Sequence, residues 1–137
     1  MEFLQLFIWI LIIAAGSGLF ILLRPKSPQG SKFNWRYKAA SKLKNLEANK
    51  MLDDKYRILE LDKIMEFILQ SKFGSTKTFG EILKENEKEF DPTPRHQIWV
   101  AHKLRNKIVH DLHYEGGKNE FAIQIKKYTK NIKELLK

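Results

Sequence analysis

The chain has 137 residues, 25 of them lysine or arginine and 16 aspartate or glutamate, and its formal net charge at pH 7 is +9. This length suits one modest domain with an accessory segment. The absence of cysteine excludes disulfides and cysteine-based metal sites. The positive charge favours polyanionic partners such as RNA, DNA or anionic lipid headgroups, although a solvated lysine-rich surface would give the same charge.

The first segment of the chain is apolar. Residues 3–23 carry no charged side chain, and as a helix they would span roughly 30 Å, the hydrocarbon thickness of a bilayer. The start lacks the basic residues of a cleaved signal peptide, and the apolar run continues well beyond Gly18. The remaining chain is too short to surround this segment as a core helix. We therefore predict an uncleaved transmembrane anchor over residues 1–23, with the lipid bilayer as a partner.

The flanking charges predict the orientation of this anchor. Residues 24–44 contain seven basic residues and no acidic one. Basic flanks stay on the cytoplasmic side, so the N-terminus is expected outside and the C-terminal domain in the cytoplasm, at the inner (plasma) membrane of the cell. The proline- and glycine-containing residues 24–32 form a short basic linker. Ala14 and Gly18 have the spacing that lets two anchor helices pack closely.

The remainder, residues 33–137, is expected to be one all-α domain. Apolar periodicity predicts an antiparallel bundle of four long helices and one short helix, over residues 33–50, 52–72, 79–90, 94–110 and 119–136. The sequence shows no strand pattern and no phosphate-binding glycine loop.

Local signals set the expected helix ends. Gly74 suits the end of the second helix, and Thr78 with Glu81 fits a capping box at the start of the short one. Thr93 is expected to cap the next helix with Pro94 at its first position, and Asn119 to cap the last.

One acidic residue lies inside a broad apolar face. The helix over residues 52–72 presents Tyr56, Leu61 and Met65 among its apolar side chains, and Asp62 lies within that surface. Asp62 is either a structural hydrogen-bond acceptor or a group that supports a functional site.

The helix over residues 94–110 carries the candidate site. Its apolar residues recur at helical spacing, while His102, Asn106 and His110 recur every four residues and so form a polar stripe on one face. Arg105 lies beside this stripe. Such a stripe is either a site or the solvated face of a helix.

The segment Arg105-Asn106-Lys107-Ile108-Val109-His110 resembles the R-x4–6-H motif of the HEPN superfamily of small all-α domains, in which Asn commonly follows the Arg. The resemblance extends over residues 33–137 and leaves the anchor outside. It implies a dimer in which two motifs face one cleft, and often a metal-independent endoribonuclease without a cofactor. Other members of the superfamily only bind nucleotide or protein, or act as dimer scaffolds.

The resemblance implies roles for the stripe in RNA cleavage by the 2′-hydroxyl. His110 would transfer the proton, and Arg105 would stabilise the anionic phosphate. Asn106 would orient His110 or the substrate, as the third catalytic residue. The auxiliary and RNA-binding residues would be His102, Lys103 and Lys107.

Two further hypotheses remain open at this stage. His110, Asp111 and His113 offer metal-ligand side chains, but zinc requires three or four converging ligands, and we predict no metal. The domain could also be a non-catalytic, membrane-tethered module that binds nucleic acid or an unidentified protein partner.

Overall fold

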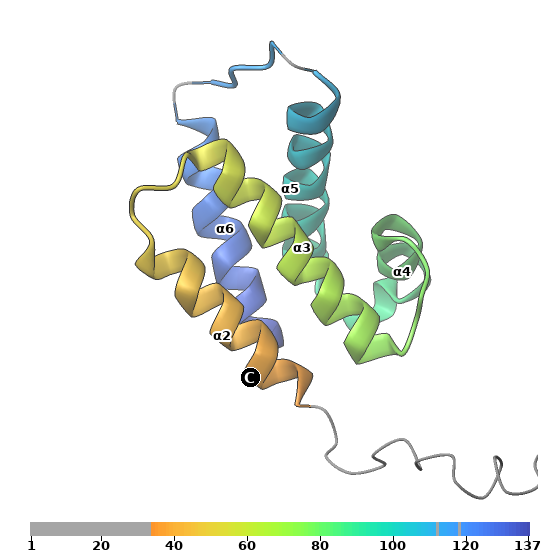
Figure 1. Cartoon of the computed structure of the whole chain (residues 1–137). Coiled ribbons are helices and arrows are strands. Elements are labelled where there is room, and N and C mark those ends of the chain that lie inside the picture. The colour runs from red at the N-terminus through yellow and green to blue at the C-terminus, as the bar shows by residue number, and fades with distance from the viewer. Residues whose placement is uncertain (1–33, 112, 118) are drawn as a thin grey trace, which may run out of the picture. The chain divides into compact units, whose positions relative to one another are not determined.

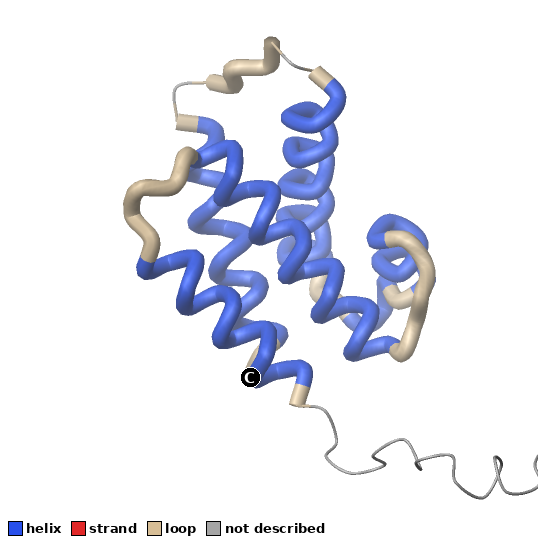
Figure 2. Tube along the Cα trace, in the orientation of Figure 1, coloured by secondary structure: helices blue, strands red, loops and turns tan. Residues whose placement is uncertain are grey.

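The computed structural model describes residues 34–111, 113–117 and 119–137 (Figure 1). Within these residues it is all-helical, with no strand, as predicted (Figure 2). Four helices have 14 to 20 residues and one has seven; they are α2 (Trp35–Ala48), α3 (Asp54–Phe73), α4 (Phe79–Glu85), α5 (Pro92–His110) and α6 (Glu120–Leu135). A short 3-10 helix, η1 (Glu87–Glu89), follows α4.

The predicted anchor and linker, residues 1–32, lie outside the described residues. Among the helices that are described, none is long and apolar enough to cross a membrane.

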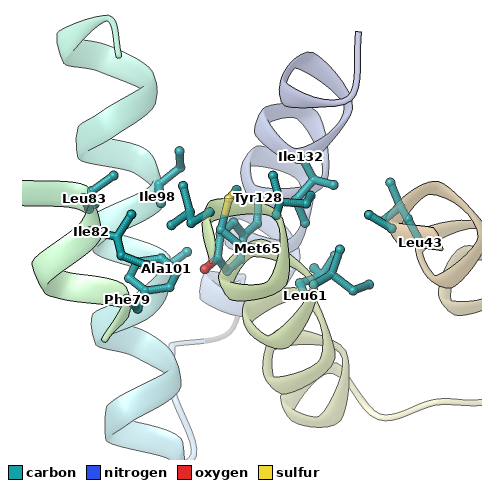
Figure 3. Close-up of a cluster of buried hydrophobic side chains, with 14 of the residues drawn as sticks. Leu43, Leu61, Met65, Phe79, Ile82, Leu83, Ile98, Ala101, Tyr128 and Ile132 are labelled. Atoms are coloured by element: carbon teal, nitrogen blue, oxygen red, sulfur yellow. The ribbon is translucent and has the colours of Figure 1, made fainter. Parts of the chain in front are cut away.

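Helix α3 is the centre of the bundle. It packs against α2, α4, α5 and α6. Its buried face includes Leu61, Met65 and Ile68, which meet Tyr128 and Ile132 of α6 in one apolar core (Figure 3). A helix with four neighbours needs an apolar surface wider than one stripe, which explains the broad apolar face in its sequence. Tyr56 is an exception to the prediction, since it is 47% exposed.

Sequence signals fix both ends of α3. The side chain of Asp53 accepts hydrogen bonds from the backbone N–H groups of Lys55 and Tyr56, at 3.1 and 3.4 Å. These groups have no partner within the helix, so a capping carboxylate stabilises its first turn. At the other end Gly74 adopts φ 60°, a left-handed conformation that glycine reaches without steric cost.

The capping box of α4 forms as predicted, with the backbone N–H of Thr78 donating to Glu81 at 2.9 Å. The helix is shorter than expected and ends at Glu85 rather than near Phe90. The cause is local: the Asn86 side chain donates to the carbonyl of Ile82 at 2.8 Å, and the chain tightens into η1. Phe90 is nevertheless buried, as the apolar spacing of residues 79–90 indicates.

Helix α5 begins two residues earlier than predicted. Asp91 is its N-cap residue and Pro92 its first residue, in place of Thr93 and Pro94. Both prolines fit the first turn, because the N–H that proline lacks would have no helical partner there. Asn119 precedes α6 as predicted, although its side chain makes no capping hydrogen bond.

Candidate functional site

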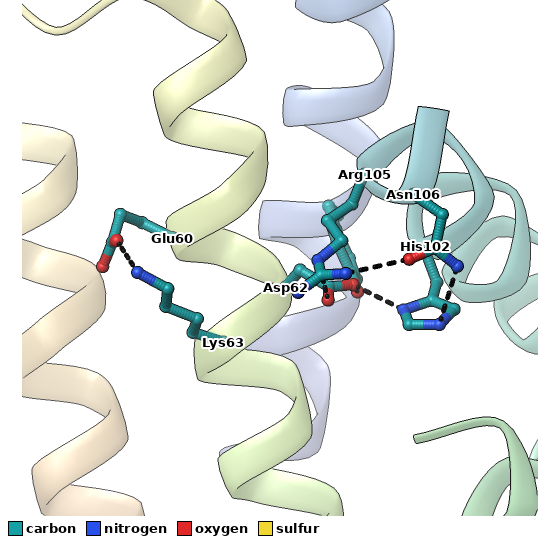
Figure 4. A network of polar contacts seen from close by, with 7 residues as sticks. Glu60, Asp62, Lys63, His102, Arg105 and Asn106 are labelled. Atoms are coloured by element: carbon teal, nitrogen blue, oxygen red, sulfur yellow. Dashed lines mark hydrogen bonds and ion pairs between the residues drawn. The ribbon is translucent and has the colours of Figure 1, made fainter. Parts of the chain in front are cut away.

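A buried carboxylate lies where α3, α5 and α6 meet. The side chain of Asp62 on α3 is only 4% exposed, among apolar neighbours of the core. A buried carboxylate without donors would be strongly destabilising. Three side chains contact it, namely His102 and Arg105 from α5 (Figure 4) and Tyr128 from α6. Both interpretations of Asp62 therefore stay compatible with its contacts, since it is a structural acceptor and also touches the polar stripe.

Tyr128 supplies the donor from α6. Its hydroxyl donates to Asp62 Oδ1 at 2.7 Å. Burial raises the pKa of Tyr128 well above its usual value of 10.0, and the neighbouring Asp62 carboxylate raises it further. The hydroxyl thus keeps its proton at neutral pH and stays a donor. The apolar spacing of residues 119–136 places Tyr128 on the apolar face of the last helix, and it gives no sign of this role of the hydroxyl.

His102 is held on three sides. Its Nδ1 lies 3.0 Å from Asp62 Oδ1, and its ring stacks on Phe79 of α4 with centroids 4.0 Å apart and planes within 4°. Because a carboxylate only accepts, the neutral ring carries its proton on Nδ1. Its Nε2 is then the basic atom, and Asn106 Nδ2 donates to it at 3.4 Å. The protein therefore selects both the orientation and the tautomer of this imidazole.

Arg105 and Asn106 complete a closed set of contacts. Arg105 Nε forms an ion pair with Asp62 Oδ2 at 3.4 Å, and its Nη1 donates to Asn106 Oδ1 at 3.0 Å. The Arg105 side chain is 33% exposed, so one part of the guanidinium is held by the protein while another part reaches solvent. We call Asp62, His102, Arg105, Asn106 and Tyr128 the polar cluster.

His110 lies apart from these contacts. It is the last residue of α5, is exposed, and its side chain makes no hydrogen bond or ion pair with another described residue. It follows Asn106 by four residues, so it continues the same face of the helix. The structure thus brings together three of the predicted site residues, His102, Arg105 and Asn106, and leaves His110 one turn further along.

The two lysines expected as auxiliary, RNA-binding residues are exposed. The Lys103 ammonium lies 5.5 Å from the ring centroid of Trp99, and that of Lys107 lies 5.6 Å from Tyr114. Cations near aromatic faces keep their charge available to solvent while their stems are partly ordered. These lysines add positive potential to the exposed side of α5.

Glu120 contacts two residues that follow α5, Tyr114 and Gly117. Its carboxylate accepts from the Tyr114 hydroxyl at 2.6 Å and from the backbone N–H of Gly117 at 3.0 Å. The hydrogen bond to Glu120 raises the pKa of Tyr114 to about 12, and the same bond lowers the pKa of Glu120. Gly116 has φ +71°, and a Cβ there would lie 2.6 Å from Phe121. These contacts tie the segment after His110 back to α6.

The metal hypothesis finds no support in the described part of the chain, where no group of three or more His, Cys, Asp or Glu could hold a metal ion. Asp111 accepts from the backbone N–H of His113 at 3.0 Å, which makes it a turn residue.

In chemical terms the arrangement offers an oriented base, an amide and a partly exposed guanidinium on one helix face, with a further imidazole one turn away. These groups suit the binding of an anionic phosphate and the transfer of a proton beside it. Comparison of the chain with protein families, with curated proteins and with solved structures found no match.

Proposed function

We propose that the domain is a metal-independent endoribonuclease whose site is the polar face of α5. The observation that supports this best is the buried Asp62 carboxylate, which orients His102 and Arg105 together. A solvated helix face does not need such support, because water satisfies its polar groups. A site that must hold phosphate oxygens and move a proton gains from side chains that are already in position.

The proposed reaction is intramolecular. The 2′-oxygen of a ribose attacks the adjacent phosphorus, and the bond from phosphorus to the 5′-oxygen breaks. The 2′-hydroxyl gives up one proton, the departing 5′-oxygen takes up one, and a 2′,3′-cyclic phosphate and a 5′-hydroxyl result. Arg105 binds the phosphate oxygens, and His110 accepts the proton of the 2′-hydroxyl, as the resemblance of the motif to HEPN domains implies. Asn106 and His102 orient the substrate and assist, while Lys103 and Lys107 attract the RNA backbone.

Two features of the proposal concern the assembly. A HEPN-like dimer would bring a second copy of this face opposite the first, and the anchor expected over residues 1–23 would hold both copies at the cytoplasmic face of the inner membrane. Light scattering of the detergent-solubilised chain tests the first feature. Labelling of single cysteines, placed before and after the anchor in intact cells, tests the second.

The decisive experiment is RNA cleavage in excess chelator. Wild type should cleave single-stranded RNA with cyclic-phosphate ends, and Arg105→Ala should lower kcat by about 10²–10³-fold, the usual loss when a donor to a developing anion is removed. His110→Ala should also abolish cleavage while the unfolding free energy stays within about 0.5 kcal/mol, because its side chain is exposed. His113→Ala, a change at a second exposed histidine three residues later, is the matched control and should leave cleavage unchanged.

A second candidate function is a non-catalytic module that binds nucleic acid or protein at the membrane. It is favoured by one observation: Arg105 already has two partners within the chain, Asp62 and Asn106, as in a purely structural clamp. RNA binding by wild type without any turnover, weakened by Arg105→Ala, would support this function over the nuclease.

A further inference from the structure

A pocket of about 370 Å³ lies between α4–η1 and the first half of α5. Its walls include Gly80 and Leu83 from α4, Glu87 from η1, and Arg95, His96 and Trp99 from α5. We call it the Trp99 pocket. Its volume falls at the lower end of the ~300–1,000 Å³ range of small-molecule sites. None of its residues belongs to the polar cluster.

Trp99 gives the pocket a flat aromatic wall that is 36% exposed. The ring packs directly against α4 at Gly80, where an added Cβ would lie 3.4 Å from Trp99 Cζ3, about van der Waals contact. Leu83 contributes an apolar surface beside it. A planar, unsaturated ligand would therefore gain stacking on the indole and lose apolar contact with water.

The pocket opens beside the proposed site. The rings of Trp99 and His102 have centroids 6.0 Å apart, and the Lys103 ammonium lies over the same indole. Trp99 precedes Arg105 by six residues, which is about 9 Å along the helix axis. At 3.6 residues per turn the two positions also lie about 120° apart around the helix, with His102 between them, so a base in the pocket lies nearest to His102.

The polar side of the pocket carries an acceptor for amino groups. Arg95 Nη1 and Glu87 Oε2 form an ion pair at 2.9 Å across it, with Glu87 more than half exposed. The second carboxylate oxygen, Oε1, makes no hydrogen bond with another described residue. Carboxylates accept hydrogen bonds from the exocyclic amino groups of bases, which adenine, cytosine and guanine have and uracil lacks.

We propose that the Trp99 pocket binds one unstacked nucleobase of single-stranded RNA, stacked on Trp99 and with its amino group on Glu87, on the same helix as the proposed phosphate site. The proposal rests on the proposed function in taking RNA as the ligand. It gives that site a sequence preference, namely for a base with an amino group over uracil. Single-stranded RNA is recognised elsewhere by this combination of aromatic stacking and hydrogen bonds to base edges.

Binding is tested with probes that the enzyme cannot cleave. Fluorescein-labelled, fully 2′-O-methylated octamers of A, C or U have no free 2′-hydroxyl, and their affinity for the purified full chain in detergent is measured by anisotropy. Wild type should bind the A and C octamers about tenfold more tightly than the U octamer. Glu87→Gln should reduce this difference, because it replaces the charged acceptor with a neutral amide.

The indole is tested by two substitutions at the same position. Trp99→Leu keeps an apolar side chain but removes the ring, and should weaken all three octamers by about 5- to 100-fold, as loss of one base stack does. Trp99→Phe restores a ring and should recover most of the affinity, and circular dichroism shows that each variant is folded. Tyr37→Leu, a change at a 74% exposed aromatic residue of α2, is the control and should bind as wild type.

The outcomes separate the two proposals, because cleavage of unmodified RNA is measured in parallel. If wild type cleaves RNA while folded Trp99→Leu binds and cleaves like wild type, the pocket proposal is overturned and the nuclease stands. If Trp99→Leu loses affinity for the octamers but wild type does not cleave, the pocket stands and the nuclease is overturned. Equal affinity of wild type for the A, C and U octamers would overturn the role of Glu87.

Discussion

Two positively charged regions of the described domain hold their cations in different ways. In the polar cluster, Arg105 and His102 contact the buried Asp62. In a groove of about 650 Å³ between α2 and α6, lysines instead pair with surface glutamates, as Lys133 does with Glu47 at 2.7 Å. Both partners of that pair are exposed, at 53% and 44%. We call this second region the α2–α6 groove.

The two regions differ in how firmly the partners of their charged side chains hold them in place. Water can replace either partner in the α2–α6 groove, so the ion pairs of its lysines contribute little to stability. Water cannot easily replace a donor to Asp62, so the side chains around it are confined to one arrangement. A high count of lysine and arginine therefore identifies neither region as a site. The buried Asp62 carboxylate is what distinguishes the polar cluster from the α2–α6 groove.

Asp62→Ala is expected to lower the unfolding free energy by the largest amount. It leaves the hydroxyl of Tyr128 without its acceptor in the core and the Arg105 guanidinium without its buried counter-charge. Loss of one partner from a buried charged network costs about 3–5 kcal/mol. Urea unfolding of residues 34–137, which form a compact unit with their own core, measures this cost.

Asp62→Asn is the matched control for that change. The amide keeps the shape and one accepting oxygen, so its cost should be clearly smaller than that of Asp62→Ala. A cost below 1 kcal/mol for Asp62→Ala would contradict the view that the carboxylate holds the cluster together.

An intermediate effect is expected from Tyr128→Phe, and it should depend on pH. The pKa of Tyr128 is raised in the folded state, so above pH 10 the unfolded chain loses this proton while the folded chain keeps it. Stability from this residue is complete below about pH 10 and falls as the pH rises further, at a limiting slope of about 1.4 kcal/mol per pH unit. Tyr128→Phe should cost about 1 kcal/mol at pH 7 and lack this alkaline loss.

Urea unfolding at pH 8 to 11 measures the difference between the two proteins. Both should carry Tyr114→Phe, because the pKa of Tyr114 is also raised, to about 12, and would add its own alkaline dependence. Parallel stability curves for the two proteins across this range would argue against a protonated Tyr128 as the donor to Asp62.

A smaller, spectroscopic effect is expected at His102. With Nδ1 donating to Asp62, the neutral ring should show the Nδ1–H tautomer in long-range ¹H–¹⁵N spectra. Asp62→Asn offers a side chain that can either donate or accept, so the preference for this tautomer should weaken. Exposed His113, with no side-chain acceptor of this kind among the described residues, is the internal reference. An Nε2–H tautomer at His102 in wild type would show that Asp62 does not orient the ring.

Local rules predicted much of this domain from its sequence. Apolar periodicity gave the helices and most of the core, and the Thr78–Glu81 and Gly74 signals placed helix ends correctly. These features depend on residues within one or two turns of each other. The predicted start of α5 was wrong by two residues. Asp91 with Pro92 and Thr93 with Pro94 both suit a helix start, and local rules do not decide between them.

The sequence predicted the residues of the candidate site on α5, but not their contacts with α3 and α6. The polar stripe of α5 follows from four-residue spacing, but its support does not, because Asp62 lies 40 residues before His102 and 66 before Tyr128. A single sequence gives no pairing over such separations. The sequence did single out Asp62, since an acid in a broad apolar face requires donors from neighbouring helices, but it did not say which side chains supply them. Tyr128, an aromatic residue with a hydroxyl on an otherwise apolar face, was the donor to look for.

The smallest effect is expected in the α2–α6 groove. Lys133→Ala and Glu47→Ala should each change the unfolding free energy of residues 34–137 by about 0.5 kcal/mol or less, because both side chains are exposed and salt screens their attraction. The double variant gives the coupling between them, which should vanish in 1 M salt. The coupling of Asp62 with Arg105, measured in the same way with Asp62→Asn and Arg105→Ala, should persist in that salt. Equal salt dependence of the two couplings would remove the distinction between an organised and a solvated cation, and with it the main physical argument for a site on α5.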